Sequence, residues 1–464
     1  MMQALPLLVD SASILKHLQS LQKIADGSGG NRLTGSDGHN RTIDYIKHEL
    51  SSLGYYVEVQ HFEGLMQVHS EATLVVNKNI FQVEPIAWSP SAKLTNLPLV
   101  PVKGGGCTAT QYPQEALGAV VLVAGGGCSF SEKSIAAGKA GADALLLHES
   151  TQLTPSMGSL NSQHIPSARI PERDARRILS HGYPLWVNIA DISTKHEHVY
   201  RFAAPGNREC GDEEKTLLVG THTDSVGTSA GINDNASGIA SLLEVAARLA
   251  EFKTNSRVKF AFWTASEPSL LGSSYFVNAA HPEELQRIRL YLDVKMIGSS
   301  NGALKVYGTN ANSPRTTMAD LPFGSEHASA TLANGFAAQN VQSKPTKISN
   351  RSDYAPFFDA NIPFGGLFSG ADGLKVAEEA RLFGGTAGLP YDSKYHEPDD
   401  DLENIDMRTL LLNTKALAHA VSIYGNSFDG LGRESAAWRH EATIEYPSLF
   451  ILAWMTCYLL SYTM

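Results

Sequence analysis

The sequence lacks the residues that mark several protein classes. Four cysteines in 464 residues are too few for a disulfide-rich scaffold, and no lysine- or arginine-rich run is present to bind a polyanion. A net charge of -10 also argues against nucleic acid as a partner. What remains, with 43% hydrophobic residues and 40 glycines, is ordinary for a soluble α/β protein of two or three domains.

The two ends of the chain differ in apolar character. Residues 1–20 lack the basic start and long apolar core of a convincing signal peptide. Residues 446–464 contain no charge and are about long enough to span a bilayer. Small residues at 435–437 and a polar spacer precede this tail, which fits a lipid-anchor signal, a retained membrane anchor, a buried helix or a gene-model error.

Three chemically active side chains follow apolar, strand-like segments between residues 217 and 272. They are His222 in GTHTDS, Asp234 in GINDNASG and Glu267 in FWTASEPSLLGS. Because ligands of an open α/β sheet bind at the carboxyl ends of its strands, we expect these side chains to lie together. One histidine and two carboxylates form a ligand set that suits zinc.

These motifs and their order resemble those of the co-catalytic zinc aminopeptidases, secreted exopeptidases that hold two metal ions. The resemblance continues through RLYLDVKMIGS, NRSDYAPF, IPFGGLFSGADG and YHEPDDDLENID, and covers most of residues 12–425. It implies an α/β zinc-exopeptidase domain, with a mixed β-sheet flanked by helices. It also implies zinc as the cofactor, peptide or protein N-termini as partners, and an extracellular or cell-surface location reached through the secretory pathway.

Matching the motifs position by position assigns roles to individual residues. The resemblance makes His222, Asp234, Glu267 and His396 metal ligands, with Asp234 bridging the two sites. It gives Asp224 the role of a carboxylate that fixes the imidazole of His222. It also makes Tyr395 a donor to a developing oxyanion.

Two positions depart from the family pattern. Ser266 stands where the family has its general base, a glutamate, and Lys295 stands where it has an aspartate ligand of the first metal. A hydroxyl has no suitable pKa for the proton transfer, and an ammonium repels a metal ion. Asp293 lies two residues before Lys295, about 6.6 Å along a strand, which is too far to replace the missing ligand.

The expected metal content is therefore one zinc ion or none. Asp234, Glu267 and His396 remain as a complete second site, a plausible mononuclear centre. Lys295 either supplies part of the charge of the missing metal or is an unpaired lysine left by relaxed selection. Three functions stay open: a degraded homologue that binds peptides with little or no hydrolysis, an active aminopeptidase with an altered centre, and a mononuclear hydrolase of another amide.

A second domain is predicted inside the first. The pattern GAVVLVAGGGCSFSEKSIAAGKAGADALLL resembles a protease-associated domain, and the resemblance implies a bridge between Cys107 and Cys128. Where the family often has another bridge, Lys394 and Asp399 form an opposite-charge pair. The predicted division is residues 1–70 and 196–425 for the peptidase domain, 71–195 for the inserted domain, and 426–464 for a spacer and hydrophobic tail.

Local patterns predict two helices, and one further segment matches a catalytic motif by chance. Apolar residues at helical spacing predict helices over 41–54, ending at Gly54, and over 236–251, leading away from Asp234. The sequence GTSAG around Ser229 matches a serine-hydrolase elbow, but it lies in a loop between two metal ligands with no helix opening at the serine. We therefore interpret it as a loop.

Overall fold

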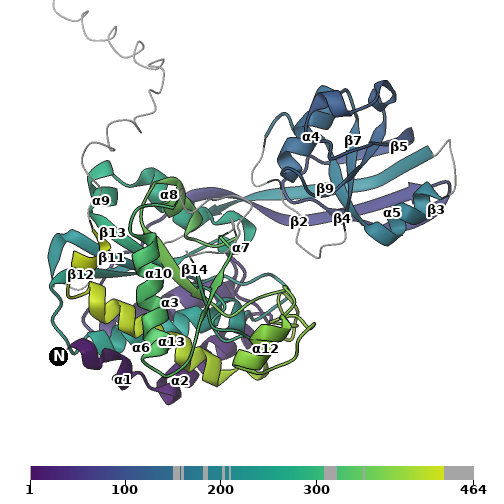
Figure 1. Cartoon of the computed structure of the whole chain (residues 1–464). Coiled ribbons are helices and arrows are strands. Elements are labelled where there is room, and N and C mark those ends of the chain that lie inside the picture. The colour runs from purple at the N-terminus through teal and green to yellow at the C-terminus, as the bar shows by residue number, and fades with distance from the viewer. Residues whose placement is uncertain are drawn as a thin grey trace, which may run out of the picture.

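The protein has two lobes joined by a long β-ribbon (Figure 1). The computed structural model describes residues 2–149, 157, 161–180, 186–200, 204–207, 211–307, 321–348 and 351–432. The larger lobe contains both the start of the chain and its last described helix. The smaller lobe is built from the middle of the first half of the chain (Figure 1).

The larger lobe is built on a mixed eight-stranded sheet with the order β1-β10-β12-β11-β13-β16-β14-β15. Its four central strands run parallel to one another. The strands are β1 (Tyr56–Val57), β10 (Ala204–Asn207), β11 (Asp212–His222), β12 (Ser256–Trp263), β13 (Ile288–Val294), β14 (Lys305–Tyr307), β15 (Lys344–Thr346) and β16 (Phe364–Phe368).

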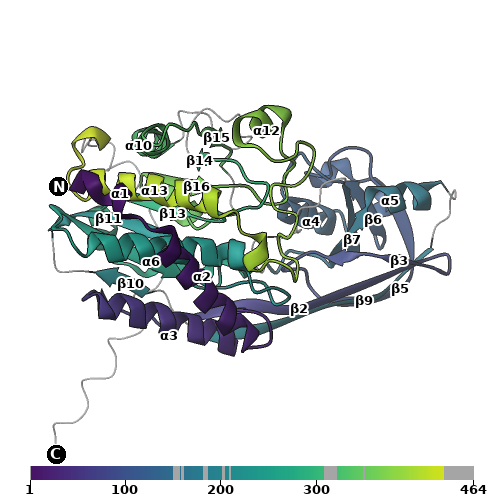
Figure 2. The same cartoon turned by 90° about the horizontal axis from the view of Figure 1, so that it is seen from below.

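Helices cover both faces of this sheet: α2, α3 and α6, which lie side by side in Figure 2, pack with α13 in one apolar cluster on one face, and α8 and α11 pack on the other. Alternate residues of β11 face opposite ways: Leu217 packs in the apolar cluster that contains α6, and Leu218 packs with Phe276 of α8. The helices are α1 (Leu5–Leu8), α2 (Ser11–Asp26), α3 (Asp37–Ser52), α6 (Ser237–Leu249), α7 (Ser266–Ser269), α8 (Leu271–Ala279), α9 (Pro282–Arg287), α10 (Ser325–Ala337), α11 (Ala355–Asp359), α12 (Ala377–Phe383) and α13 (Met407–Tyr424), with short turns η1 (Met2–Ala4), η4 (Ile232–Ala236), η6 (Leu402–Asn404) and η7 (Asp429–Leu431).

The smaller lobe has its own eight-stranded sheet, with the order β3-β2-β9-β5-β6-β7-β8-β4. Strands β5 to β8 are parallel, and β2 pairs antiparallel with β9 along the ribbon. Its elements are β2 (Glu63–Val76), β3 (Asn79–Gln82), β4 (Glu84–Pro85), β5 (Ala92–Pro101), η2 (Ala109–Gln111), η3 (Gln114–Ala116), β6 (Val120–Ala124), α4 (Phe130–Lys139), β7 (Ala144–Glu149), β8 (Ser167–Pro171), α5 (Glu172–Leu179) and β9 (Trp186–Tyr200).

The predicted helices are present with shifted ends. The helix expected over 41–54 is α3, which starts earlier because the Ser36 side chain accepts from the backbone of His39 and caps it. Gly54 follows it with a φ of +80°. The helix expected over 236–251 is α6. The ribbon crosses both predicted domain boundaries, since β2 starts at Glu63 and β9 ends at Tyr200.

The predicted tail, residues 446–464, lies outside the described residues. Within the described ranges, the structure contains no helix long and apolar enough to cross a bilayer.

Candidate metal centre

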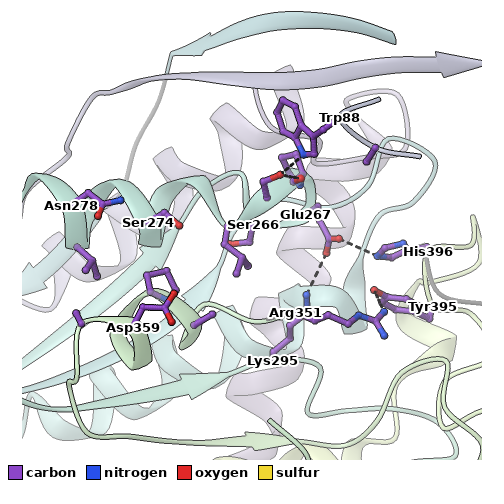
Figure 3. Close-up of a pocket in the computed structure, with 18 residues that line it drawn as sticks. Trp88, Ser266, Glu267, Ser274, Asn278, Lys295, Arg351, Asp359, Tyr395 and His396 are labelled. Carbon is purple, nitrogen blue, oxygen red and sulfur yellow. Dashed lines mark hydrogen bonds and ion pairs between the residues drawn. The ribbon is translucent and has the colours of Figure 1, made fainter. Parts of the chain in front are cut away.

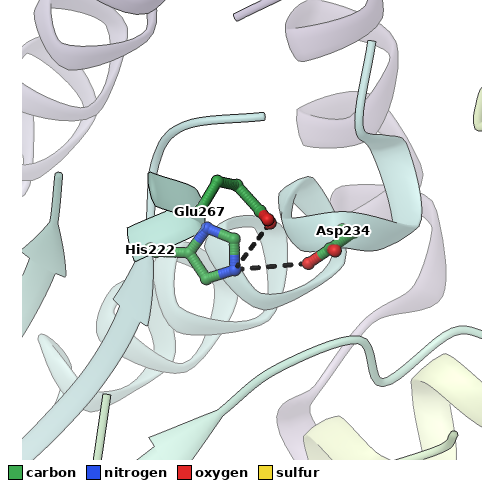
Figure 4. A group of neighbouring side chains, drawn as sticks. All are labelled: His222, Asp234 and Glu267. Atoms are coloured by element: carbon green, nitrogen blue, oxygen red, sulfur yellow. Dashed lines mark ion pairs between the residues drawn. The ribbon is translucent and has the colours of Figure 1, made fainter. Parts of the chain in front are cut away.

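Three of the predicted ligands meet at the carboxyl ends of the central strands. His222 is the last residue of β11, Asp234 lies in η4, which follows the loop after β11, and Glu267 lies in α7 directly after β12. The His222 Nε2 atom is 3.3 Å from Asp234 Oδ1 and 3.8 Å from Glu267 Oε1 (Figure 4). Their ligand atoms all lie within 4.8 Å of one another.

His396 completes the group from the loop between α12 and η6. Its Nε2 atom lies 3.0 Å from Glu267 Oε2 and 3.4 Å from Asp234 Oδ2. Five buried atoms here have no hydrogen-bond partner among the described residues: His222 Nε2, both carboxylate oxygens of Asp234, Glu267 Oε1 and His396 Nε2. Buried polar atoms without partners are costly, and their convergence on one point fits a zinc ion bound by imidazole and carboxylate.

Lys295, the residue that follows β13, lies beside the carboxylates of Asp234 and Glu267. Its ammonium lies 3.8 Å from Asp234 Oδ1 and 3.9 Å from Glu267 Oε1, and the residue is 8% exposed. Burial lowers the pKa of Lys295, but the two carboxylates raise it further, so the net shift is upward. The lysine therefore stays charged, and it is paired with both carboxylates.

The loop that carries Asp234 is held by buried partners on both sides. Asp400 accepts hydrogen bonds from the backbone nitrogens of Asn233 at 2.8 Å and Asp234 at 3.1 Å. Arg32, fully buried, donates to the carbonyl oxygens of Thr223, Ala230 and Gly231. The position of Asp234 is thus fixed by residues from distant parts of the chain.

Asp224 orients the site mainly through backbone groups. Its two carboxylate oxygens each accept at 3.1 Å from a backbone nitrogen, one from Ser266 and one from Glu267. Its carboxylate is 3.6 Å from His222 Nδ1, whereas its own carbonyl oxygen is nearer, at 3.1 Å. The resemblance implied that this carboxylate fixes the imidazole; in the structure it also fixes the start of α7, and with it Glu267.

Ser266, at the predicted base position, is hydrogen-bonded to a buried carboxyl group. Its hydroxyl lies 2.8 Å and 2.7 Å from the two carboxylate oxygens of Asp353, which is 1% exposed. Ser273 also donates to Asp353. Burial raises the pKa of Asp353. Asp293 is buried too, but it is bonded to Tyr291 and Ser352 and is not in the metal cluster.

Tyr395 lies beside the metal cluster and is held by an arginine. Arg351 donates to the Tyr395 hydroxyl at 3.2 Å and to Asp372 at 3.3 Å. The Tyr395 ring stacks on the His396 ring with centroids 3.8 Å apart. A hydroxyl that accepts from Arg351 keeps its own proton for donation, which suits the predicted role toward an oxyanion.

A cavity of about 630 Å³ opens beside the cluster and is lined by both lobes (Figure 3). Glu267, His396, Lys295 and Tyr395 line its inner end. Trp88 from the smaller lobe lines another part, and its indole nitrogen donates to Ser269 Oγ at 2.8 Å. The cavity, which we call the main cavity, is large enough for several residues of a peptide.

Three residues around the cluster have unusual backbone conformations. Ala265 precedes the base position, Met296 follows Lys295, and His396 is itself a predicted ligand; their φ angles are +54°, +48° and +63°. Non-glycine residues rarely adopt the left-handed region, and such strain gathers at functional sites. The packing around the cluster therefore fixes the backbone of these three residues in conformations that they would not adopt by themselves.

The sequence did not identify Asp353, Arg32, Arg351 or Trp88 as parts of the site. Asp353 and Arg351 lie in the quoted NRSDYAPF segment, so that motif was a usable signal. Arg32 and Trp88 carried no motif, because they reach the site through tertiary packing.

Other expected pairs are present in the structure. Cys107 and Cys128 are joined by a disulfide, and Lys394 contacts Asp399 at 2.6 Å. Ser229 lies in a buried loop and its hydroxyl accepts from the backbone nitrogen of Gly231, so the GTSAG segment is not a serine-hydrolase elbow.

Comparison with known proteins agrees with the fold and the geometry. Residues 204–421 match Peptidase family M28, and residues 95–178 match the PA domain. A probable leucine aminopeptidase 2 of Trichophyton verrucosum is 34% identical over 94% of this chain and 88% of its own length. Leucine aminopeptidase 2 of Arthroderma otae is 36% identical over 86% of this chain and 81% of its own length.

Solved structures share the fold. An aminopeptidase of Aneurinibacillus sp. strain AM-1 superposes with a TM-score of 0.73 at 22% identity, covering 91% of this chain and 95% of its own. A zinc aminopeptidase of Bacillus subtilis superposes with a TM-score of 0.64 at 20% identity, covering 90% and 98%.

Proposed function

Since the chain belongs to peptidase family M28, and carries the inserted PA domain, we propose that it is a zinc aminopeptidase homologue that holds one zinc ion, binds peptides and hydrolyses them slowly or not at all. One observation carries the proposal: the unpartnered ligand atoms of Asp234, Glu267 and His396 converge, while the Lys295 ammonium lies within 4 Å of the two carboxylates.

The zinc ion would be held by Asp234, Glu267 and His396, and His222 Nε2 lies 3.3 Å from Asp234 Oδ1. A bound zinc ion supplies Lewis-acid polarisation of a peptide carbonyl. A second dication would have to share this space with the ammonium of Lys295, and two like charges a few ångströms apart in a cleft repel strongly. The charge of Lys295 therefore favours one metal over two.

The low activity follows from the base position. Positioned proton transfer contributes roughly 10² to 10⁴ in rate, and a serine hydroxyl does not accept a proton near neutral pH. The Ser266 hydroxyl also donates to the buried carboxylate of Asp353. Binding is supported separately by the main cavity, which both lobes line.

A second candidate is an active aminopeptidase with an altered centre. The Ser266 hydroxyl contacts a buried carboxylate whose pKa is raised by burial, so Asp353 is a proton acceptor one hydroxyl away from the base position. Tyr395 also keeps its place next to the cluster. These two features would allow turnover without the family glutamate.

Metal content and turnover of the full chain separate the two candidates. We expect about one zinc per chain by elemental analysis and little release from aminoacyl 4-nitroanilides. The double variant S266E/K295D should bind a second zinc and gain activity by about 10² or more, whereas the uncharged matched pair S266Q/K295N should gain none. Two tightly held zinc ions in the unmodified chain would contradict the proposal, and strong turnover abolished by a chelator would favour the second candidate.

The same proposal places the protein in an oxidising compartment. The disulfide between Cys107 and Cys128 supports a secreted or cell-surface location, because such bridges persist mainly there. Mass analysis of the protein from its natural source, with and without reduction, tests whether the bridge is formed.

A further inference from the structure

A second cavity, of about 350 Å³, lies on the other side of Lys295, Arg351 and Tyr395 from the main cavity. We propose that this cavity binds a carboxylate of the peptide, so that the site selects peptides with an acidic group next to the bond at the metal cluster. The inference rests on the proposed function and names its substrate class. We call this space the cationic cavity; it is lined by Lys295, Met296, Tyr307, Thr346, Lys347, Arg351, Phe368, Ala371, Asp372, Gly373, Tyr391 and Tyr395.

The charges in the lining are unequal. Three cations, Lys295, Lys347 and Arg351, face one anion, Asp372, and that anion is bonded to Arg351 at 3.3 Å. Lys347 is exposed, and no ion pair among the described residues engages it. The Arg351 and Asp372 charges cancel, which leaves Lys295 and Lys347 in excess.

The partners of Lys295 do not change this balance when metal is bound. They are Asp234 and Glu267, the same carboxylates that the proposed zinc ion engages. A zinc ion would take up most of the negative charge of these two groups. The ammonium of Lys295 would then be available to an anion that enters the cationic cavity, and a cationic group would be repelled there.

The walls of the cationic cavity are mainly aromatic, which indicates the kind of group that fits there. Phe368 and Tyr307 stack with centroids 5.8 Å apart, and both line the cavity together with Tyr391. The Tyr391 hydroxyl is taken by Glu379, and Lys305 lies 3.7 Å above the Tyr391 ring, so this wall presents an aromatic surface with its polar groups already paired. An aromatic floor with cations at its edge suits a short methylene stem that ends in a carboxylate.

The position of the cavity shows which part of a peptide would enter it. Lys295, Arg351 and Tyr395 line both cavities, and the ligands Glu267 and His396 line the main cavity next to them. A peptide bond placed at the cluster would therefore have one neighbouring residue in the cationic cavity and the rest of the chain in the main cavity. The carboxylate comes either from an aspartate or glutamate side chain or from a free C-terminus.

We propose to test the inference by measuring hydrolysis and ligand binding with the zinc-loaded full chain. The substrates are glutamyl, aspartyl, leucyl and lysyl 4-nitroanilide and an N-acetylated dipeptide with a free C-terminus. Binding of L-glutamic acid α-amide, L-leucine amide and the N-acetylated dipeptide is measured by calorimetry, which does not need turnover; the α-amides leave the glutamate side chain as the only carboxylate that distinguishes the first two. The variant K347E reverses one charge of the cationic cavity, and K139E, at the end of α4 in the smaller lobe, is the matched control.

We expect glutamate to be preferred over leucine, and the preference to fall about fivefold or more in K347E but not in K139E. Preference for the N-acetylated dipeptide would support the same carboxylate site with the C-terminus as its source. Equal or better binding of leucine or lysine compounds, or a glutamate preference that K347E leaves unchanged, would overturn the inference. If nothing is hydrolysed, the proposed function still holds, because it includes binding without hydrolysis, and the calorimetric preference alone decides the inference; two tightly held zinc ions would contradict the proposed function and leave that preference as a separate result.

Discussion

The hydroxyl of Ser266 contacts both carboxylate oxygens of Asp353, at 2.8 Å and 2.7 Å. A hydroxyl has a single proton to donate, so this contact uses it on a buried acid, while Ser266 still lines the main cavity (Figure 3). Ser266, which we expect to stand at the family's base position, therefore has a bonding partner of its own.

Replacing Asp353 by alanine should lower stability and leave the metal in place. The variant D353A leaves the buried hydroxyl of Ser266 without its acceptor and removes one of the two acceptors of Ser273, which costs about 1–3 kcal/mol. The melting temperature should fall while zinc per chain stays unchanged, because Asp353 is not a ligand. The control D359A removes an exposed acid. Loss of zinc in D353A would mean that Asp353 has a direct role in metal binding.

Replacing Arg32 by methionine should disturb both stability and metal binding. Arg32 is fully buried and donates to three carbonyl oxygens of the loop that leads to Asp234. Leaving these groups unpaired costs about 3–5 kcal/mol. Thermal unfolding and elemental analysis of R32M should both show losses, whereas R41M, at an exposed site on α3, should stay within about 0.5 kcal/mol. An R32M chain with normal zinc content would show that the loop does not need this arginine.

The stability of the larger lobe should fall below neutral pH partly through His17. Burial lowers the pKa of His17 on α2, whose Nδ1 atom is 2.7 Å from the Tyr45 hydroxyl on α3. Below the unfolded pKa of about 6.5, the unfolded chain takes up a proton that the folded chain resists, so stability is lost as the pH falls. The drop in melting temperature between pH 7.5 and 5.5 should be smaller in H17Q than in the unmodified chain.

The exposed His48 of α3 provides the control for His17. The variant H48Q should keep the pH dependence of the unmodified protein. If H17Q and H48Q have the same slope, the burial of His17 does not contribute to acid sensitivity.

Replacing Trp88 should weaken binding of longer peptides more than of single aminoacyl compounds. Trp88 lines the main cavity from the smaller lobe and donates to Ser269. Loss of a buried aromatic contact in W88A should weaken tetrapeptide binding by about tenfold, with a smaller loss in W88F, which keeps a ring. Calorimetry of the tetrapeptide and of leucine amide measures the difference. An equal loss for both ligands would indicate general damage to the site.

Motifs in the sequence were sufficient to predict the strand-end placement of the ligands. His222 and Glu267 follow buried parallel strands, and such strand ends meet at one edge of a sheet. The ends of α3 and α6 were less accurate, because caps such as Ser36 depend on local geometry. The partners of Ser266 and Asp224 were not predictable, since they join segments far apart in the chain through packing.

Lys295 illustrates the same limit at a single position. Its match to a ligand position of the family rests on the gapless motif RLYLDVKMIGS and stays a prediction, whereas its proximity to Asp234 is seen in the structure. Its second contact, with Glu267, depends on how α7 is oriented by Asp224. Whether the lysine changes the number of metal ions stays a prediction for elemental analysis.

The β2–β9 ribbon connects the smaller lobe to the larger lobe as a single insertion in the chain. The pairing runs from Glu63 with Tyr200 to Val76 with Val187, so the chain leaves the larger lobe and returns to it at neighbouring points. Paired strands are only about 5 Å apart, a distance that a tight turn bridges. The whole lobe could therefore be gained, lost or exchanged in evolution without changing the path of the chain through the larger lobe. A different lobe on the same β2–β9 ribbon would place different residues in the lining of the main cavity.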